Sequence, residues 1–437
     1  MSEVRDFFPS ARAIADRTHA YATLDISAES GHVALVTDTA VVTAHTHADL
    51  CSGALSVAAA APRTSRFVTR RSTAVEEAGS LEVRTRDSFV RCYRAACWSP
   101  CGLAAAGRSA APLLAACGGV ACDARVLRPP ALAEGSCPPW EVVATPSEAL
   151  LRHHLELWAE QQDEGSKEVP SKPEKRRRKT AASSAAAAPA SAPEDAQTPA
   201  QERARETEQL DETEQLAAAF LERLGVPKVS EEEAETGPRT RMGTTVALRA
   251  RAVVPVAAAW SQIVSTGTGD RLALLAVASR RTVALHAFAA TSSPDSSESP
   301  QPCHELAVLD LGDVDNNGST TEITCLAFSC PKETADQPAR VQDIVLALGT
   351  SSGTVVLVEL GDDGTRPTVR EVVLAPCSLN RFVTAARFVQ PSTLVLVSGR
   401  TLCVLSTDTK KQSTAQLASG GTSLAYSRAT ERLYVGT

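Results

Sequence analysis

Four cysteines near residue 100 have the side chains that bind zinc. They are spaced as Cys97-x3-Cys101 and Cys117-x4-Cys122. Zinc knuckles instead prefer two residues between paired ligands, in glycine-rich turns. Cys97, Cys117 and Cys122 also lie in apolar, strand-like runs, which would distribute them over different faces of a sheet. We therefore expect reduced thiols packed in a core, and no metal site.

A second candidate metal site is the segment from Asp313 to Gly318, which has the opening residues of a calcium-binding loop. Such a loop needs a bidentate carboxylate at its twelfth position, where this chain has Thr324. The segments on either side have the pattern of strands and not of the helices that flank such loops. A turn between two strands is favoured.

Histidine pairs could in principle do acid–base chemistry. His153 and His154 would be neighbours on a helix and point in different directions, and His45 and His47 lie at the edge of a loop. Neither pair is accompanied by a carboxylate or a nucleophile that could converge on it, so we expect surface histidines. The sequence predicts no catalytic residue, no cofactor and no metal ligand.

Two basic clusters could bind acidic partners. The eight-residue segment KPEKRRRK carries six basic residues: Lys172, Lys175, Arg176, Arg177, Arg178 and Lys179. Such a compact, exposed charge fits the acidic groove of an import receptor and predicts nuclear localisation, with nucleic-acid contact as a second option. The segment Arg63–Arg71 places four arginines around Phe67, and an exposed loop is favoured there over a DNA contact.

Composition limits the class of protein. The 437 residues carry a net charge of −7, which argues against a surface built mainly to bind nucleic acid. No apolar run reaches 18 residues, and charges interrupt the first twenty, so we expect neither a membrane span nor a secretory leader. With its cysteines in apolar runs, the chain is expected to be soluble and intracellular.

Changes in composition and periodicity predict four regions. Short Val/Leu-rich runs fill both ends of the chain, and a Lys/Glu/Ser/Pro/Ala-rich stretch without apolar periodicity separates them. Ser147–Gln162 and Leu210–Leu224 have helical spacing. The predicted regions are 1–162, N-terminal propeller blades plus a helix; 163–204, a disordered linker; 205–226, a short amphipathic helix; and 240–437, C-terminal blades.

A repeat predicts the fold. The sequence ITCLAFSCP…DIVLALGTSSGTVVLVEL is followed by VTAARFVQP…TLVLVSGRTLCVLST and then by GTSLAYSRATERLYVGT. Each unit is a strand ending in an aromatic residue, an apolar strand ending near Gly, a Gly turn and another apolar strand. Units of this order predict an all-β, WD40-like β-propeller of about six to seven blades, the last incomplete. A β-sandwich or a mixed α+β fold is the alternative. The short last unit indicates either closure of the ring by N-terminal strands or a truncated sequence.

The segment VRCYRAACWSPCGL, from Val90 to Leu103, is followed by PLLAACGGVACDARVLRPP and PPWEVVATPSEALLRHH. Together they resemble the N-terminal WD40-like region of the delta (90-kDa-type) subunit of transcription factor IIIC. The residues that match the family's turn are Trp98, Ser99, Pro100 and Gly102, and Trp140 stands where its second tryptophan would. The resemblance is best over Val90–Trp158. The chain departs from the typical WD40 pattern in lacking the Trp-Asp signature, and it has no CxxC pairs like those of the family's zinc ribbon.

The resemblance implies a non-catalytic, nuclear scaffold subunit that supports initiation by RNA polymerase III through protein–protein contacts. Its implied partners are other factor IIIC subunits and polymerase III initiation factors, with direct DNA contact left open. Histone acetyltransferase activity, which has been ascribed to the family, is one alternative, although no acetyl-CoA cradle is evident in the sequence. A generic WD40 adaptor in another nuclear or cytoplasmic complex is the other.

Overall fold

A computed structural model describes a defined part of the chain. The described residues are 24–26, 32–36, 41–45, 93–103, 112–118, 123–128, 141–165, 218–219, 221–222, 226, 249–250, 252–290, 303–311, 321–331, 339–364, 366–379, 382–427 and 431–436. They belong to two compact units. Met1–Arg152 and Ala250–Thr437 form the first unit, and His153–Arg249 forms the second.

The first unit begins with two antiparallel sheets, of three and four strands. The three-stranded sheet contains β1 (Leu24–Ile26), β2 (His32–Val36) and β3 (Val41–His45). The four-stranded sheet contains β4 (Tyr93–Trp98), β5 (Leu114–Gly118), β6 (Asp123–Arg128) and β7 (Glu141–Ala144). In both sheets each strand pairs with the next along the chain, so each sheet is a meander.

Four more antiparallel sheets follow in the same unit. The first has β8 (Ala257–Trp260), β9 (Val264–Ser265), β10 (Arg271–Ala278), β11 (Thr282–Ala289) and β12 (His304–Asp310). The second has β13 (Ile323–Phe328), β14 (Val345–Thr350), β15 (Thr354–Asp362) and β16 (Pro367–Ser378), with the short 3₁₀ helix η4 (Val341–Asp343) before β14. The third has β17 (Ala385–Gln390), β18 (Thr393–Ser398), β19 (Thr401–Ser406) and β20 (Gln412–Gln416). The last has β21 (Ser423–Ser427) and β22 (Arg432–Gly436).

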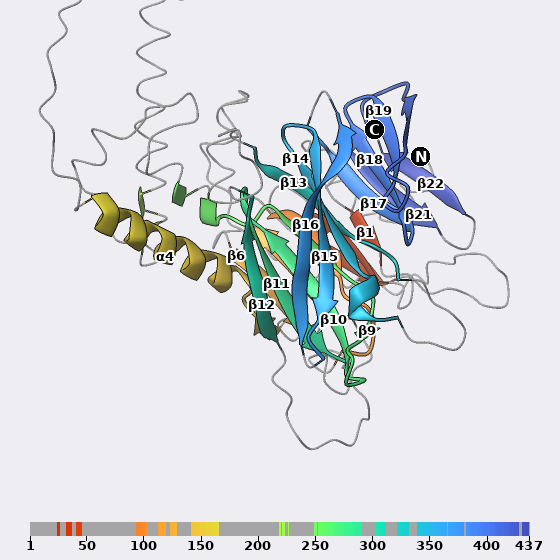
Figure 1. Cartoon of the computed structure of the whole chain (residues 1–437). Coiled ribbons are helices and arrows are strands. Elements are labelled where there is room, and N and C mark those ends of the chain that lie inside the picture. The colour runs from red at the N-terminus through yellow and green to blue at the C-terminus, as the bar shows by residue number, and fades with distance from the viewer. Residues whose placement is uncertain are drawn as a thin grey trace, which may run out of the picture. The chain divides into compact units, whose positions relative to one another are not determined.

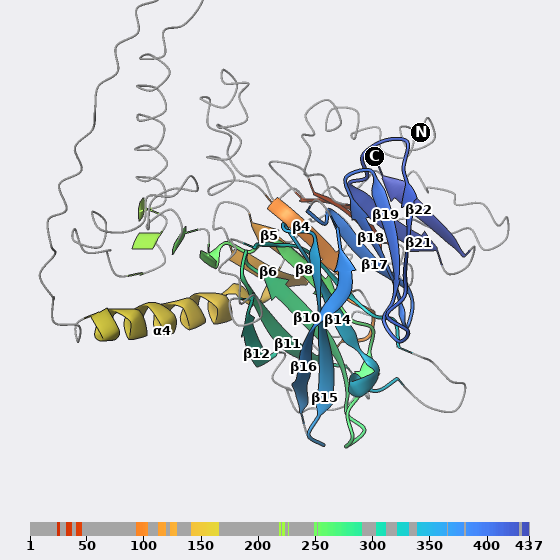
Figure 2. The same ribbon diagram turned by 45° about the horizontal axis from the view of Figure 1, so that its top comes forward.

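The way the sheets meet defines the fold. The first strand of each sheet contacts the first strand of the next, in the order β4, β8, β13, β17 and β21, while β1 and β2 contact β4 (Figures 1 and 2). Four-stranded meanders whose first strands lie side by side are the blades of a β-propeller. The predicted all-β, WD40-like propeller is therefore confirmed, with six sheets among the described residues.

The core lies between neighbouring blades, and β10 shows how the sequence produces it. Leu272, Leu274 and Ala276 of β10 belong to the apolar cluster shared with β13–β16. The alternate residues, such as Leu275 and Val277, belong to the cluster shared with β4–β7. Successive strand residues point to opposite faces, so a strand with a blade on each side is apolar throughout. Burial of each such leucine contributes roughly 1.5–3 kcal/mol.

One long helix, α4, covers Ser147–Gly165, where helical spacing predicted a helix over Ser147–Gln162. The predicted linker over 163–204 and helix over 205–226 lie almost entirely outside the described residues and stay predictions. Within the part of the chain that the structure describes, no helix is both long enough and apolar enough to cross a bilayer.

Candidate functional site

The turn after β4 contains the residues on which the family resemblance depends. The amide of Ser99 donates to the carbonyl of Leu113 at 2.8 Å, and the hydroxyl of Ser99 accepts from the Leu113 amide at 2.8 Å. The same hydroxyl donates to the Pro100 carbonyl at 2.8 Å. Trp98 is buried, and Gly102 has a φ of +84°, a conformation that favours glycine. These residues hold the first strand of a blade to the second.

The same device recurs in two other blades. Ser261 exchanges 2.8 Å hydrogen bonds with Leu274, through its amide and its hydroxyl, and Ser329 does so with Val345. Each serine follows an aromatic residue at the end of the blade's first strand. Because its hydroxyl is engaged in joining two strands, this recurring serine is a structural residue and not a nucleophile.

Threonines join neighbouring blades in an equivalent way. The hydroxyl of Thr324, at the start of β13, lies 3.0 Å from the carbonyl oxygen of Gly349 and 2.6 Å from that of Val383 in the next blade. The hydroxyl of Thr384 similarly lies 3.0 Å from the carbonyls of Val397 and Gly421. Thr324 thus contacts backbone carbonyls at the position where a calcium loop requires a carboxylate. The rest of that predicted turn, residues 313–318, lies outside the described residues.

The cysteines considered for zinc have different surroundings. Cys117 is fully buried on β5, and burial raises the pKa of its thiol to about 12, to which the Asp123 charge adds. Such burial is typical of a thiol packed in a core. Cys97 and Cys101 are half-buried, and Cys122 lies outside the described residues. Among the residues that the structure describes, no three His, Cys, Asp or Glu side chains form a potential metal site.

One thiol–imidazole pair was not identified from the sequence. The sulfur of Cys303 lies 3.7 Å from Nδ1 of His286 on β11. Burial, and then the charge of Glu305, raise the pKa of Cys303 to about 12. Burial lowers the pKa of His286 to about 4. Both shifts have burial as their largest cause, and the pair packs within its blade.

The histidines of α4 also have a structural role. The expectation of surface histidines is wrong for His154, which is only 5% exposed. Its ring stacks on Trp158 at 5.6 Å between centroids, and the guanidinium of Arg249 lies 5.2 Å from the centroid of the same indole. His153 meets His154 edge-on at 5.7 Å. His45 ends β3, and His47 lies outside the described residues.

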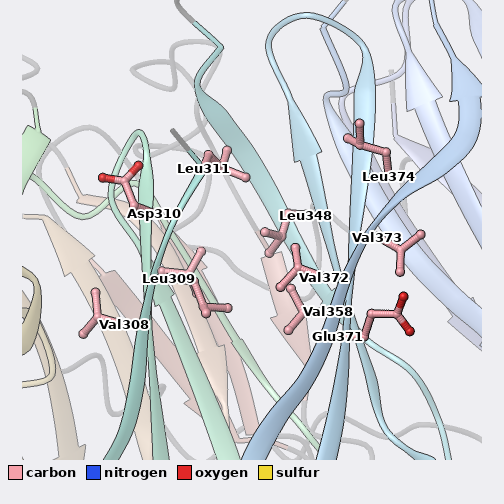
Figure 3. Close-up of a pocket in the computed structure, with 11 residues that line it drawn as sticks. Val308, Leu309, Asp310, Leu311, Leu348, Val358, Glu371, Val372, Val373 and Leu374 are labelled. Carbon is pink, nitrogen blue, oxygen red and sulfur yellow. The ribbon is translucent and has the colours of Figure 1, made fainter. Parts of the chain in front are cut away.

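The strongest candidate for a functional surface is a groove between the outer strands of two blades. It lies between β12 and β16 and has a volume of about 570 Å³ (Figure 3). Cavities of roughly 300–1,000 Å³ are typical of binding sites. Its lining is nine aliphatic residues and two carboxylates: Val283, Val308, Leu309, Asp310, Leu311, Leu348, Val358, Glu371, Val372, Val373 and Leu374. We call this the β12–β16 groove.

Strand alternation decides which of these side chains form its interior. Figure 3 shows Leu309 on β12, and Leu311 just after that strand, turned toward the side of Leu348, Val358 and Val372. Val358 belongs to the apolar cluster between the two blades, and Val372 and Leu309 pack against that cluster. The interior of the groove is therefore aliphatic.

The mouth and rim of the groove are accessible to a partner. Leu374 at the mouth is 51% exposed, an unusual value for a leucine beside a packed core. Asp310 and Glu371 occupy the alternate strand positions, and Figure 3 shows their carboxylates turned away from the interior residues. The groove thus offers an aliphatic surface for binding.

The basic residues proposed for nuclear import, Lys172–Lys179, lie outside the described residues, as does the segment Arg63–Arg71.

The sequence did not identify the groove. Its two walls come from strands about sixty residues apart, and each wall alone has the alternation of any blade strand.

No protein-family model and no curated protein sequence matches the chain. Solved structures do match. The crystal structure of Chaetomium thermophilum Sqt1 bound to the N-terminus of ribosomal protein L10 is 8% identical over 94% of this chain and 79% of that chain, with a TM-score of 0.35. The RRP9 WD40 repeats are 14% identical over 41% of this chain, with a TM-score of 0.25, and the chain spans about half (50%) of their length. Chaetomium thermophilum Raptor is 16% identical over 42% of this chain and 14% of that chain, with a TM-score of 0.26. Because these identities and TM-scores are low, the fold is assigned from the arrangement of the protein's own sheets and not from these structures.

Proposed function

We propose that the chain is a non-catalytic, protein-binding scaffold, and that it works as the delta-type subunit of transcription factor IIIC. The observation that carries the scaffold role is the β12–β16 groove, an aliphatic surface held open between two rigid blades. Propellers serve such roles well because packed blades hold their surfaces at fixed positions relative to one another.

The buried thiol–imidazole pair supports a non-catalytic role. Burial raises the pKa of Cys303 and lowers that of His286, which favours the neutral form of both groups. The finer assignment is supported by the sequence resemblance over Val90–Trp158. Other factor IIIC subunits and polymerase III initiation factors are the proposed partners.

The proposed place of action is the nucleus, because Lys172–Lys179 has the charge density of an import signal. Replacing its six basic residues by Gln in a fluorescently tagged full chain should move the protein from nucleus to cytoplasm. Replacing the four arginines of Arg63–Arg71 by Gln is the matched control, which should leave the distribution unchanged. An unchanged distribution of the first variant would contradict the proposed signal.

Affinity purification of the tagged full chain from nuclei, followed by mass spectrometry, tests the function. Recovery of other factor IIIC subunits is the expected result. Recovery of a different complex, such as a vesicle coat, would replace the finer assignment by a generic adaptor, and no stable partner at all would overturn the scaffold role. The purified chain mixed with histones and labelled acetyl-CoA should transfer no label above background.

A further inference from the structure

Turns of three neighbouring blades are joined at one end of the sheets. They connect the two central strands of the blades that contain β10, β14 and β18. In each blade, a backbone carbonyl at this turn accepts a hydrogen bond from an amide at the start of the next blade. The pairs are Ile323 with Arg280 at 2.6 Å, Val383 with Thr350 at 2.9 Å and Gly421 with Gly399 at 2.8 Å. The three turns and the segments that lead into the next blades therefore form one shared surface.

The exposed charges of this surface are positive. Arg281 and Arg400 lie in the turns after β10 and β18, and both are exposed. Neither has an ion-pair partner among the described residues, whereas Arg280 pairs with Glu322. No described Asp or Glu of the three turns, or of the segments that follow their blades, is exposed. The turns at the opposite end carry exposed charges of both signs: Asp270, Asp343, Asp363, Arg340, Arg366 and Lys411.

An exposed aromatic side chain lies between the two arginine turns in the order of the blades. Phe382 is 52% exposed, in the segment that leads from β16 into β17. The next residue, Val383, is fully buried and its amide donates to the Thr350 carbonyl, so the exposed ring stands on a fixed backbone. Aromatic and arginine side chains carry much of the binding energy of protein interfaces. We call Arg281, Phe382 and Arg400 the turn surface.

The charges select the kind of partner. The chain as a whole carries a net charge of −7, so an acidic ligand is repelled by most of the protein and attracted to the turn surface. A nucleic acid is also acidic, but its affinity depends on many phosphate contacts, of which two arginines would supply few. An acidic peptide needs only a few carboxylates, and its apolar side chains can pack on Phe382. It therefore fits the turn surface better than a nucleic acid does.

We propose that the turn surface binds an acidic peptide segment of a partner protein. Carboxylates of the segment pair with Arg281 and Arg400, and an aromatic or aliphatic side chain between them packs on Phe382. The arginines orient the segment and select against basic segments, while the contact with Phe382 excludes water. This inference rests on the proposed scaffold function, because it names the chemistry of one partner.

A displayed library of random peptides, selected against the purified full chain, tests the inference. The enriched peptides should have a net negative charge and at least one aromatic or large aliphatic residue. Fluorescence anisotropy of an enriched, labelled peptide then compares the variants. The double substitution Arg281→Glu/Arg400→Glu should weaken its binding about tenfold or more, and Phe382→Ser should weaken it about fivefold.

Matched controls lie at other exposed positions. Arg366→Glu reverses an exposed arginine in a turn at the opposite end, and Tyr434→Ser truncates an aromatic side chain on β22 that is 53% exposed. Each should change binding less than about twofold. Circular dichroism and thermal melting of all variants check that they fold, as expected for substitutions at exposed positions.

Salt and a second ligand separate the contributions. Raising the salt concentration to about 0.5 M should weaken wild-type binding several-fold, because exposed ion pairs are screened, whereas the effect of Phe382→Ser should persist. A short DNA duplex and a short single-stranded RNA should each bind more weakly than the enriched peptide.

Three results would overturn the inference. They are no enrichment of peptides with a net negative charge, tighter binding of a nucleic acid than of the peptide, and losses no larger in the arginine and Phe382 variants than in their controls. Failure of the scaffold function is distinguishable, because the wild-type chain would then recover no partner from nuclei. Failure of this inference alone would leave that recovery intact in Arg281→Glu/Arg400→Glu.

Discussion

Replacing Gly349 by alanine should lower the stability of the protein, because it crowds the contact between two blades. Gly349 lies in β14, and a Cβ atom added to it would sit 2.5 Å from the sulfur of Cys325 and 2.8–2.9 Å from side-chain atoms of Val383. Ordinary contacts of this kind are 3.4–4 Å. Val383 begins the next blade, and Thr324 bridges the carbonyls of Gly349 and Val383, so neither neighbour can move alone. Overpacking of a rigid core costs about 1–3 kcal/mol, and with backbone-anchored neighbours we expect about 2–3 kcal/mol.

Urea unfolding measures this cost. With an m-value of about 3 kcal/mol per molar, the midpoint should fall by roughly 0.7–1 M. Intrinsic tryptophan fluorescence is a suitable probe, since Trp98 is buried and Trp260 packs edge-on against Phe288 at 4.9 Å. Gly420→Ala is the matched control, because its nearest neighbour is a carbonyl oxygen 3.9 Å away, and it should stay within about 0.5 kcal/mol of wild type. Equal midpoints for the two variants would refute the proposed tight contact between blades.

Two further substitutions test the same structure. His286, whose pKa burial lowers from 6.5 to about 4, binds fewer protons folded than unfolded, so stability should rise with pH between about 4 and 6.5 by at most about 3 kcal/mol. Urea unfolding at pH 4.5 and pH 7 should show a smaller difference in His286→Gln than in wild type, and identical differences would contradict the neutral, buried imidazole. Ser329→Ala leaves the Val345 amide without its acceptor and should cost about 1–3 kcal/mol, with faster hydrogen exchange at that amide. Ser413→Ala on the exposed strand β20 should cost less than about 0.5 kcal/mol, and an equal loss there would contradict the role of Ser329.

Features carried by neighbouring residues could be predicted from the sequence. The repeat over Ile323–Leu360 predicts three strands because apolar runs, aromatic ends and Gly turns are local signals, and β13, β14 and β15 lie there. The helix at Ser147 follows from the spacing of its apolar residues. The aromatic-serine pairs, such as Trp98-Ser99 and Phe328-Ser329, were also visible. Their role in joining two strands could not be predicted, because the hydrogen-bond partner of each serine lies 13 to 16 residues away.

Features made by distant residues could not be predicted. The burial of His154 depends on Trp158 and Arg249, and the latter is 95 residues further along the chain, so helical position alone predicted exposure. The groove depends on how far apart the outer ends of two blades stand, a distance set by packing at Val358 and Leu348 and not by any local pattern. In the sequence, its residues therefore have the pattern of ordinary strand residues, and only the packing of the two blades brings them together.

Photo-crosslinking from the mouth of the groove shows whether a partner protein lies there. A benzophenone amino acid at position 374 of the full chain, irradiated in nuclear extract, should crosslink to a factor IIIC or polymerase III initiation-factor subunit. The same group at position 142, also exposed on an outer strand, should not crosslink to that subunit. No crosslink at 374, or the same crosslinks from both positions, would contradict a scaffold that holds a partner in the β12–β16 groove.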